Sequence, residues 1–173
     1  MSFNFMDLTS DIRQKMIKEI QEDIAKNNLY YSKRFNQNGN QKYPEILIKN
    51  VTSNGNDVSL GLELKENQCF LTEEMSARGL RKVPVNAPEI FAEGEFNRFY
   101  IRALCLHALA EGKKLEVYRA KNVVGARSSS QEKIGDLVDP QSLLNDVRNN
   151  IGIDTHLGLP AGPNSGLSVK LVD

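Results

Sequence analysis

Apolar residues recur three and four positions apart in the first part of the chain, and this spacing predicts a helix. The helix is expected to begin after Thr9 and Ser10, either of which can cap the first turn, and to end near Asn27 and Asn28. Its apolar stripe consists of Ile12, Met16, Ile17, Ile20 and Ile24. Because the stripe covers one side only, we expect an amphipathic surface helix.

The longest predicted helix runs from about Asn86 to Glu111. Asn86 is a candidate N-cap, Pro88 suits the first turn, and Gly112 is a residue that readily stops a helix in the left-handed conformation. Apolar residues cover more than half of the circumference of this segment, so we expect the helix to be largely buried.

Apolar and polar residues alternate between these two helices, which predicts strands over residues 45–52 and 58–65 and a third short strand near residues 68–71. Asn54-Gly55 separates the first two runs and is a strong hairpin signal, because both residues accept a positive φ. We therefore expect an antiparallel β-meander with one solvated face. The flanking residues 29–43 and 76–85 are predicted to be loops.

The last third of the chain predicts a strand over residues 115–120, a serine-rich loop over residues 125–132 and a final helix that begins at Asp139-Pro140. A strand-like run ends the chain. The predicted fold is α+β, with the β-meander packed against the long central helix, an N-terminal amphipathic helix and a short C-terminal helix plus strand. Residues 1–157 would form a single domain, and residues 158–173 a Gly/Pro-rich C-terminal arm.

Composition narrows the function classes. The 173 residues include 22 basic and 22 acidic side chains, so the chain lacks the basic excess of a typical sequence-independent nucleic-acid binder. Cys69 and Cys105 have neither zinc-ligand nor disulfide spacing, which predicts reduced core thiols. The N-terminal residues are too polar for a signal peptide, and no run approaches the ~20 apolar residues of a membrane span, so we expect a cytoplasmic protein without membrane contact.

Two arginines on the predicted long helix are the first candidate for function. Arg98 and Arg102 are four residues apart and share a stripe, on which like charges repel unless an anion lies between them. Three further cations precede the helix, namely Arg78, Arg81 and Lys82. These five residues predict a basic surface for an anionic ligand or an acidic protein partner. The alternative is a structural salt-bridge network with carboxylates nearby in the sequence, namely Glu93, Glu95 or Glu116.

An acidic residue followed by a Glu-x-Lys triplet is the second candidate. Asp57 with Glu63-Leu64-Lys65 is the layout of metal-dependent nucleases, in which carboxylates hold Mg²⁺ and lysine polarises the attacking water. The predicted element order also resembles the core of the PD-(D/E)xK nuclease superfamily. In that family the aspartate and the triplet usually lie on neighbouring strands, whereas here Asp57 and Glu63 fall on one predicted strand. A Mg²⁺-dependent nuclease is thus the enzymatic alternative, beside a plain solvated strand face.

The two histidines lack an obvious set of partners. His107 lies on the buried face of the long helix, where we expect a core histidine paired with Glu111. Cys105 is two residues away and therefore faces another side of the helix, so these two side chains do not form one metal or haem site. His156 has neither an acid nor a nucleophile beside it in the sequence.

Two other segments suggest partners. Residues 30–35 interleave aromatic rings with Lys33 and Arg34, a pattern that can stack bases and pair phosphates, or can anchor a loop on the core. The arm over residues 158–173 could add a strand to its own sheet or to that of a neighbour, which predicts homo-oligomerisation as an option. No motif indicates a cofactor or a convergent nucleophile and base. We therefore expect a non-catalytic binding or assembly domain.

Overall fold

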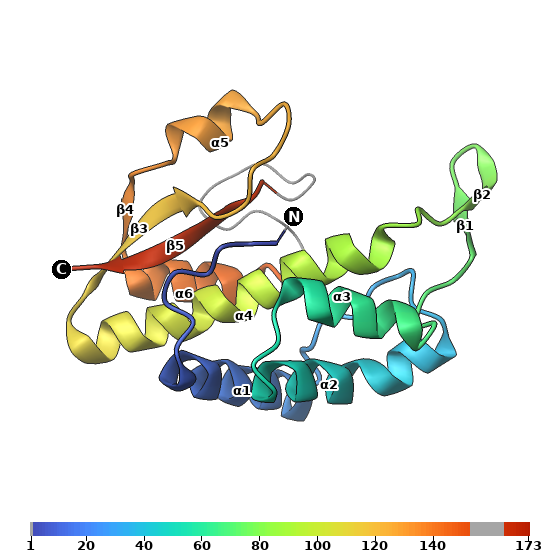
Figure 1. Ribbon diagram of the computed structural model, residues 1–173, viewed down its shortest axis with the longest axis horizontal. Coiled ribbons are helices and arrows are strands. Elements are labelled where there is room, and N and C mark those ends of the chain that lie inside the picture. The colour runs from blue at the N-terminus through green and yellow to red at the C-terminus, as the bar shows by residue number, and fades with distance from the viewer. Residues whose placement is uncertain (1, 153–164) are drawn as a thin grey trace.

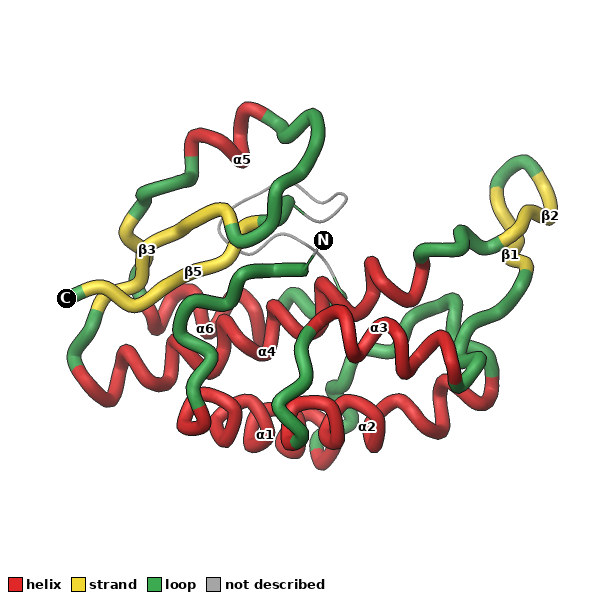
Figure 2. Tube along the Cα trace, viewed as in Figure 1, coloured by secondary structure: helices red, strands yellow, loops and turns green. Residues whose placement is uncertain are grey.

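The computed structural model describes residues 2–152 and 165–173 (Figures 1 and 2). His156 and the glycine- and proline-rich part of the predicted arm lie outside these residues. The helices of the described part are α1 (Ser10–Ala25), α2 (Gln37–Thr52), α3 (Asp57–Glu66), α4 (Ala87–Glu111), α5 (Ser128–Glu132) and α6 (Pro140–Asn149). The strands are β1 (Glu73–Ser76), β2 (Gly79–Lys82), β3 (Lys114–Arg119), β4 (Leu137–Val138) and β5 (Leu167–Val172).

Helix α4 runs through the middle of the molecule and contacts α1, α3, α6 and the strands β3 and β5 (Figure 1). Every residue from Glu95 to Cys105 is buried, as the broad apolar face of the sequence predicts. Gly112 ends the helix with a φ of 65°, and its N–H donates to the carbonyl oxygen of Ala108. Asn86 occupies the N-cap position but its side chain makes no capping hydrogen bond. The α+β class with a long central helix is confirmed.

The three-stranded sheet is antiparallel, in the order β4-β3-β5. The predicted C-terminal strand is present as β5, which pairs with β3 of its own chain from Lys114↔Val172 to Arg119↔Leu167. Two side chains bind backbone groups of β5. Asp7 accepts a hydrogen bond from the Leu171 N–H at 3.0 Å, and Asn97 donates to the Leu167 oxygen at 2.9 Å. The outer edge of β5 is therefore partly closed by the same chain.

The β-meander predicted over residues 45–65 is wrong, because α2 and α3 occupy this stretch. The buried residues of α2 after its first turn are Tyr43, Ile46, Leu47, Asn50 and Val51, which is helical spacing. Those of α3 are Asp57, Leu60, Gly61 and Leu64. Leu60 and Leu64 belong to an alternating run, but Leu62 between them is exposed and so does not define a strand face.

The turn-forming residues of this stretch do form a turn, but the turn connects two helices and not two strands. Asn54 adopts a φ of 58° and leads into Asn56, which caps α3 by accepting from the Ser59 N–H at 3.0 Å. Pro44 lies inside α2, a position at which proline usually breaks or kinks a helix. The strand predicted near residues 68–71 is reduced to a single bridge between Phe35 and Phe70. Conversely, residues 76–85 contain most of a β-hairpin, and α5 lies within the predicted loop 125–132.

A buried ionic network joins α4 to α1 and α6. The Arg102 side chain, 1% exposed, donates from Nε to Glu19 at 2.6 Å and from both terminal nitrogens to Asp23 at 2.6 and 2.9 Å. Arg148 of α6 also donates to Glu19, at 3.0 Å from its Nε. Burial alone would raise the pKa of Glu19, but hydrogen bonds from Arg148 and Arg102 outweigh it and lower that pKa. Three helices are thus held by charges that satisfy one another.

Arg102→Met should destabilise the protein strongly, since it leaves the buried Asp23 carboxylate without its Arg102 partner and removes one of the three hydrogen bonds that Arg102 and Arg148 donate to Glu19. Breaking a buried ion pair from one side costs about 3 to 5 kcal/mol. Urea unfolding measures the loss. Lys15→Met is the matched control, because among the described residues Lys15 pairs only with the exposed Asp11 and its replacement should leave the free energy of unfolding nearly unchanged. Equal stabilities for the two variants would contradict this role of Arg102.

The lowered pKa of Glu19 predicts a pH-dependent effect of Glu19→Gln. A carboxyl whose pKa is lower in the folded state stabilises the protein above its unfolded pKa, and this contribution disappears as pH falls through the folded pKa. The stability difference between wild type and Glu19→Gln should therefore be largest above about pH 5 and shrink in more acidic solution. Glu22→Gln, which removes an exposed carboxylate on the same helix, should show a small difference throughout.

Candidate interaction site

The β1–β2 hairpin projects away from the helical body beyond the first turn of α4 (Figure 1). Its register pairs Glu73 with Lys82, Glu74 with Arg81, Met75 with Leu80 and Ser76 with Gly79. Gly79 has a φ of 105°, which a residue with a side chain rarely adopts, and its carbonyl oxygen accepts from the Ser76 hydroxyl at 2.7 Å. Ala77 and Arg78 form the tip of this closed turn.

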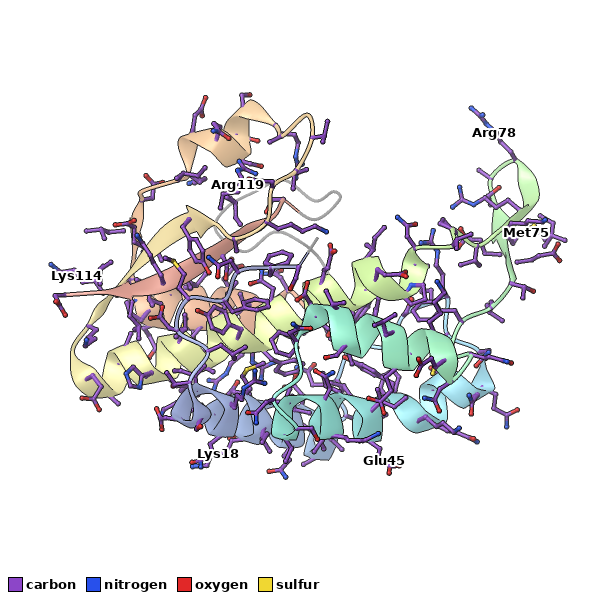
Figure 3. The ribbon with its side chains drawn as sticks, viewed as in Figure 1. Lys18, Glu45, Met75, Arg78, Lys114 and Arg119 are labelled. Carbon is purple, nitrogen blue, oxygen red and sulfur yellow. The ribbon has the colours of Figure 1, made fainter. Side chains whose placement is uncertain are left out.

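One face of the hairpin is apolar and exposed. Residues directly opposite in an antiparallel pair share a face, so Met75 and Leu80 lie together, with Glu73 and Lys82 beyond them. The exposed fractions are 77% for Met75 and 64% for Leu80. Figure 3 shows Met75 on the hairpin and Arg78 at its outer end, pointing away from the body. Val85, between the hairpin and α4, is also exposed.

The opposite face is attached to the body through Glu74. Arg34 donates to Glu74 from Nε at 2.7 Å and from Nη2 at 2.9 Å, and Arg81 adds an ion pair at 2.7 Å. The hydrogen bonds from Arg34 and Arg81 lower the pKa of Glu74. At the base, the Val83 N–H donates to Thr72 and the Leu71 N–H to Arg34. Because the Glu74 face is turned to the body, the Met75–Leu80 face is turned outward.

The three cations on residues 78–82 differ in whether a carboxylate neutralises them. Arg81 is partly neutralised by Glu74. Arg78 and Lys82 are exposed and form no ion pair with any residue of the described part of the chain. The hairpin therefore presents two unpaired positive charges beside an apolar pair.

Arg98 and Arg102 do not join this surface, which corrects the prediction of one basic surface formed by all five cations. Arg102 lies in the network described above, and Arg98 is buried beside Glu95, with which it forms an ion pair. Burial nevertheless raises the pKa of Glu95, whereas Arg98 acts in the opposite direction. The Arg98 guanidinium also lies over the Tyr30 ring, 5.7 Å from its centroid. For Arg98, the structure therefore matches the alternative prediction of a salt bridge with Glu95.

The predicted nuclease residues are not brought together. Asp57 is buried in the first turn of α3, where it accepts hydrogen bonds from the Phe3 N–H at 3.1 Å and the Ser2 hydroxyl at 2.7 Å. Glu63 pairs with Lys49 at 2.6 Å, and Lys65 with Glu89 at 3.6 Å. Residues two apart on a helix point in different directions, so Glu63 and Lys65 do not face one site. Within residues 2–152 and 165–173, no three His, Cys, Asp or Glu side chains are grouped to hold a metal ion.

The remaining candidate side chains have structural partners. His107 lies 3.0 Å from the Asp11 carboxylate, rather than beside Glu111 as predicted, because α1 packs against this part of α4. Cys69 and Cys105 are free and buried, and burial raises the pKa of both thiols. In the segment 30–35, the Phe35 ring packs within 5.3 Å of the Tyr43 and Phe91 rings. That ring therefore anchors the loop to the core.

The sequence contains a signal for the hairpin in the order of its charged residues, which a count of charges does not show. Two acidic residues, Glu73 and Glu74, precede the turn, and two basic residues, Arg81 and Lys82, follow it at mirrored positions. Opposite charges on facing positions favour strand pairing. A prediction based on the cations gives a charged loop, because it leaves out the acidic residues on the facing positions. It leaves out the facing apolar residues Met75 and Leu80 as well.

Comparison with known proteins adds no functional information. No protein-family model, curated protein or solved structure matches the chain. In the described residues, no helix combines the length and the apolar character needed to cross a bilayer.

The anchoring of the hairpin by Glu74 predicts a local effect. Glu74→Gln should raise the hydrogen-exchange rates of the hairpin amides, including that of Val83, by roughly three- to fivefold, because it weakens the Arg34 and Arg81 contacts. Glu73→Gln is the matched control on the same strand, since Glu73 has no ion pair among the described residues. If both substitutions changed exchange equally, the Arg34–Glu74 contact would not be the anchor.

Proposed function

We propose that this protein is a non-catalytic binding domain whose β1–β2 hairpin binds an acidic protein surface that carries exposed apolar side chains. The observation that supports the proposal is the outward face formed by Met75 and Leu80, with Arg78 at the tip and Lys82 beside it. Methionine, arginine and exposed apolar pairs of this kind are enriched at protein interfaces. The proposal retains the acidic partner predicted from the sequence and reduces the five predicted cations to those on the hairpin.

The construction of the hairpin fits this role better than a purely structural one. A two-stranded hairpin is marginal by itself in water, yet this one is fixed at its base by the bidentate Arg34–Glu74 pair and closed by Gly79. Its outward face gives nothing to the core, since Met75 and Leu80 remain exposed. A rigid element loses little conformational entropy on binding, which favours its use as a contact surface.

The expected affinity is modest. Fully burying a Met or Leu side chain contributes about 1.5 to 3 kcal/mol each, whereas association itself costs at least about 4 kcal/mol. Two apolar anchors therefore need the charges of Arg78 and Lys82 to produce measurable binding. Charged residues at the rim mainly increase the association rate and make it sensitive to salt. We expect weak, salt-dependent and rapidly reversible binding.

A synthetic probe tests the proposal directly. A dye-labelled ten-residue peptide of alternating leucine and aspartate should bind the wild type in fluorescence anisotropy, and both Arg78→Glu and Met75→Ser should weaken this binding by roughly tenfold, the equivalent of about 1.4 kcal/mol. Raising the salt concentration should weaken it further.

Two controls make the result specific. Lys18→Glu changes the net charge as Arg78→Glu does, but lies on the exposed side of α1, far from the hairpin in Figure 3, and should bind as the wild type does. A peptide with lysine in place of aspartate should not bind. The proposal fails if the acidic peptide does not bind, or if Arg78→Glu has no more effect than Lys18→Glu.

A further inference from the structure

A second exposed apolar surface lies around β4 and is acidic where the hairpin is basic. Ile134 is 39% exposed and Leu137 is 60% exposed. Residues 132–139 contain Glu132, Asp136 and Asp139 against the single cation Lys133, a net charge of −2 from three negative charges and one positive. Lys133 pairs with Asp136 at 3.9 Å, so the excess negative charge is that of Glu132 and Asp139. We call this surface the β4 patch, defined by Glu132, Ile134, Leu137 and Asp139, because alternation along the strand places Leu137 and Asp139 on the same side and Asp136 on the other.

The β4 patch has the features that the proposed function requires of a partner. It combines two exposed apolar side chains with an excess of carboxylates, whereas residues 73–82 carry three cations, Arg78, Arg81 and Lys82, against Glu73 and Glu74, a net charge of +1. The Glu74 charge is also directed to the body by Arg34. Strand β4 pairs with β3 on one side and is the last strand on its side of the sheet, so its other side is not paired within the sheet.

The two surfaces lie at opposite ends of the long axis of the molecule, with β4 near one end and the hairpin at the other (Figure 1). One copy therefore cannot join its own hairpin to its own β4 patch. A contact between the two surfaces therefore requires two copies, which can lie head to tail.

We propose that the hairpin of one copy binds the β4 patch of a second copy of this chain. Met75 and Leu80 would cover Leu137 and Ile134, while Arg78 and Lys82 face Asp139 and Glu132. The inference rests on the proposed function and names its partner. It differs from self-association through the C-terminal arm, because β5 is already paired with β3 of its own chain.

In the proposed head-to-tail arrangement the contact is heterologous, because two neighbouring copies share one hairpin–patch contact and not two reciprocal ones. Each dimer therefore keeps one free hairpin and one free β4 patch, and further copies can add at either end. The mean mass in solution should rise with protein concentration without stopping at a dimer. A symmetric arrangement, either hairpin against hairpin or two reciprocal hairpin–patch contacts, would stop at two copies.

Mixing two single variants distinguishes these cases. Met75→Asp disables the hairpin and Leu137→Asp disables the β4 patch, and both residues are exposed, so neither change enters the core. In sedimentation equilibrium the wild type should associate progressively, and each variant alone should associate at least roughly tenfold more weakly, about 1.4 kcal/mol. An equimolar mixture should form a 1:1 dimer and nothing larger, because it contains one intact hairpin and one intact patch per pair.

Sedimentation equilibrium of a control variant tests whether the association is specific. Leu62→Asp removes an exposed leucine from α3 and should associate as the wild type does, which excludes general apolar aggregation. Circular dichroism melting checks that all variants are folded. The inference is overturned if the wild type remains monomeric at every concentration, if association stops at a dimer, or if the mixture of variants does not associate.

The failure of this inference is separable from that of the proposed function. A monomeric wild type that still binds the leucine–aspartate peptide through Arg78 would show that the acidic partner is another protein. Loss of peptide binding as well would remove the function of the hairpin.

Discussion

The complete burial of the middle of α4 is the constraint on which the rest of the structure depends. A helix buried on all sides leaves no room for a solvated cation, yet this one carries Arg98 and Arg102 within its buried stretch. An unpaired charge there would cost several kcal/mol, so carboxylates must be supplied by whatever packs against the helix. Glu19 and Asp23 of α1 and Glu95 of α4 itself supply them.

This pairing also decides where function can lie. The network fixes the positions of α1 and α6 against α4 and uses the two arginines in doing so, which removes them from any surface. Of the five cations predicted to form a basic surface, the three that remain at the surface lie on an element outside the core. The hairpin is such an element, and its attachment through Arg34 and Glu74 gives it a defined orientation without burying its apolar face.

The errors of the sequence interpretation follow from one cause. Residues 57–66 satisfy both a strand pattern and a helix pattern, since Leu60, Leu62 and Leu64 alternate while Leu60, Gly61 and Leu64 follow helical spacing. Only the position of α4 beside α3, with Gly61 close to Ala92, decides between them. Similarly, Glu19 and Asp23 lie off the apolar stripe predicted for the first helix, and nothing local distinguishes them from carboxylates that remain in water.

The sequence by itself determined those features whose physical cause lies within a few residues. Thr9 and Asp139 cap α1 and α6, because each side chain accepts a hydrogen bond from a backbone N–H of the first turn. Gly112 ends α4, because it adopts a left-handed conformation and its N–H donates to the carbonyl oxygen of Ala108. The tertiary structure decided which charges are buried and which remain available for binding. Arg102 and Glu19 are 83 residues apart, and the free energy of a buried ion pair depends on the two partners meeting in space. The periodicity of apolar residues along one segment does not show which residues of another segment it will contact.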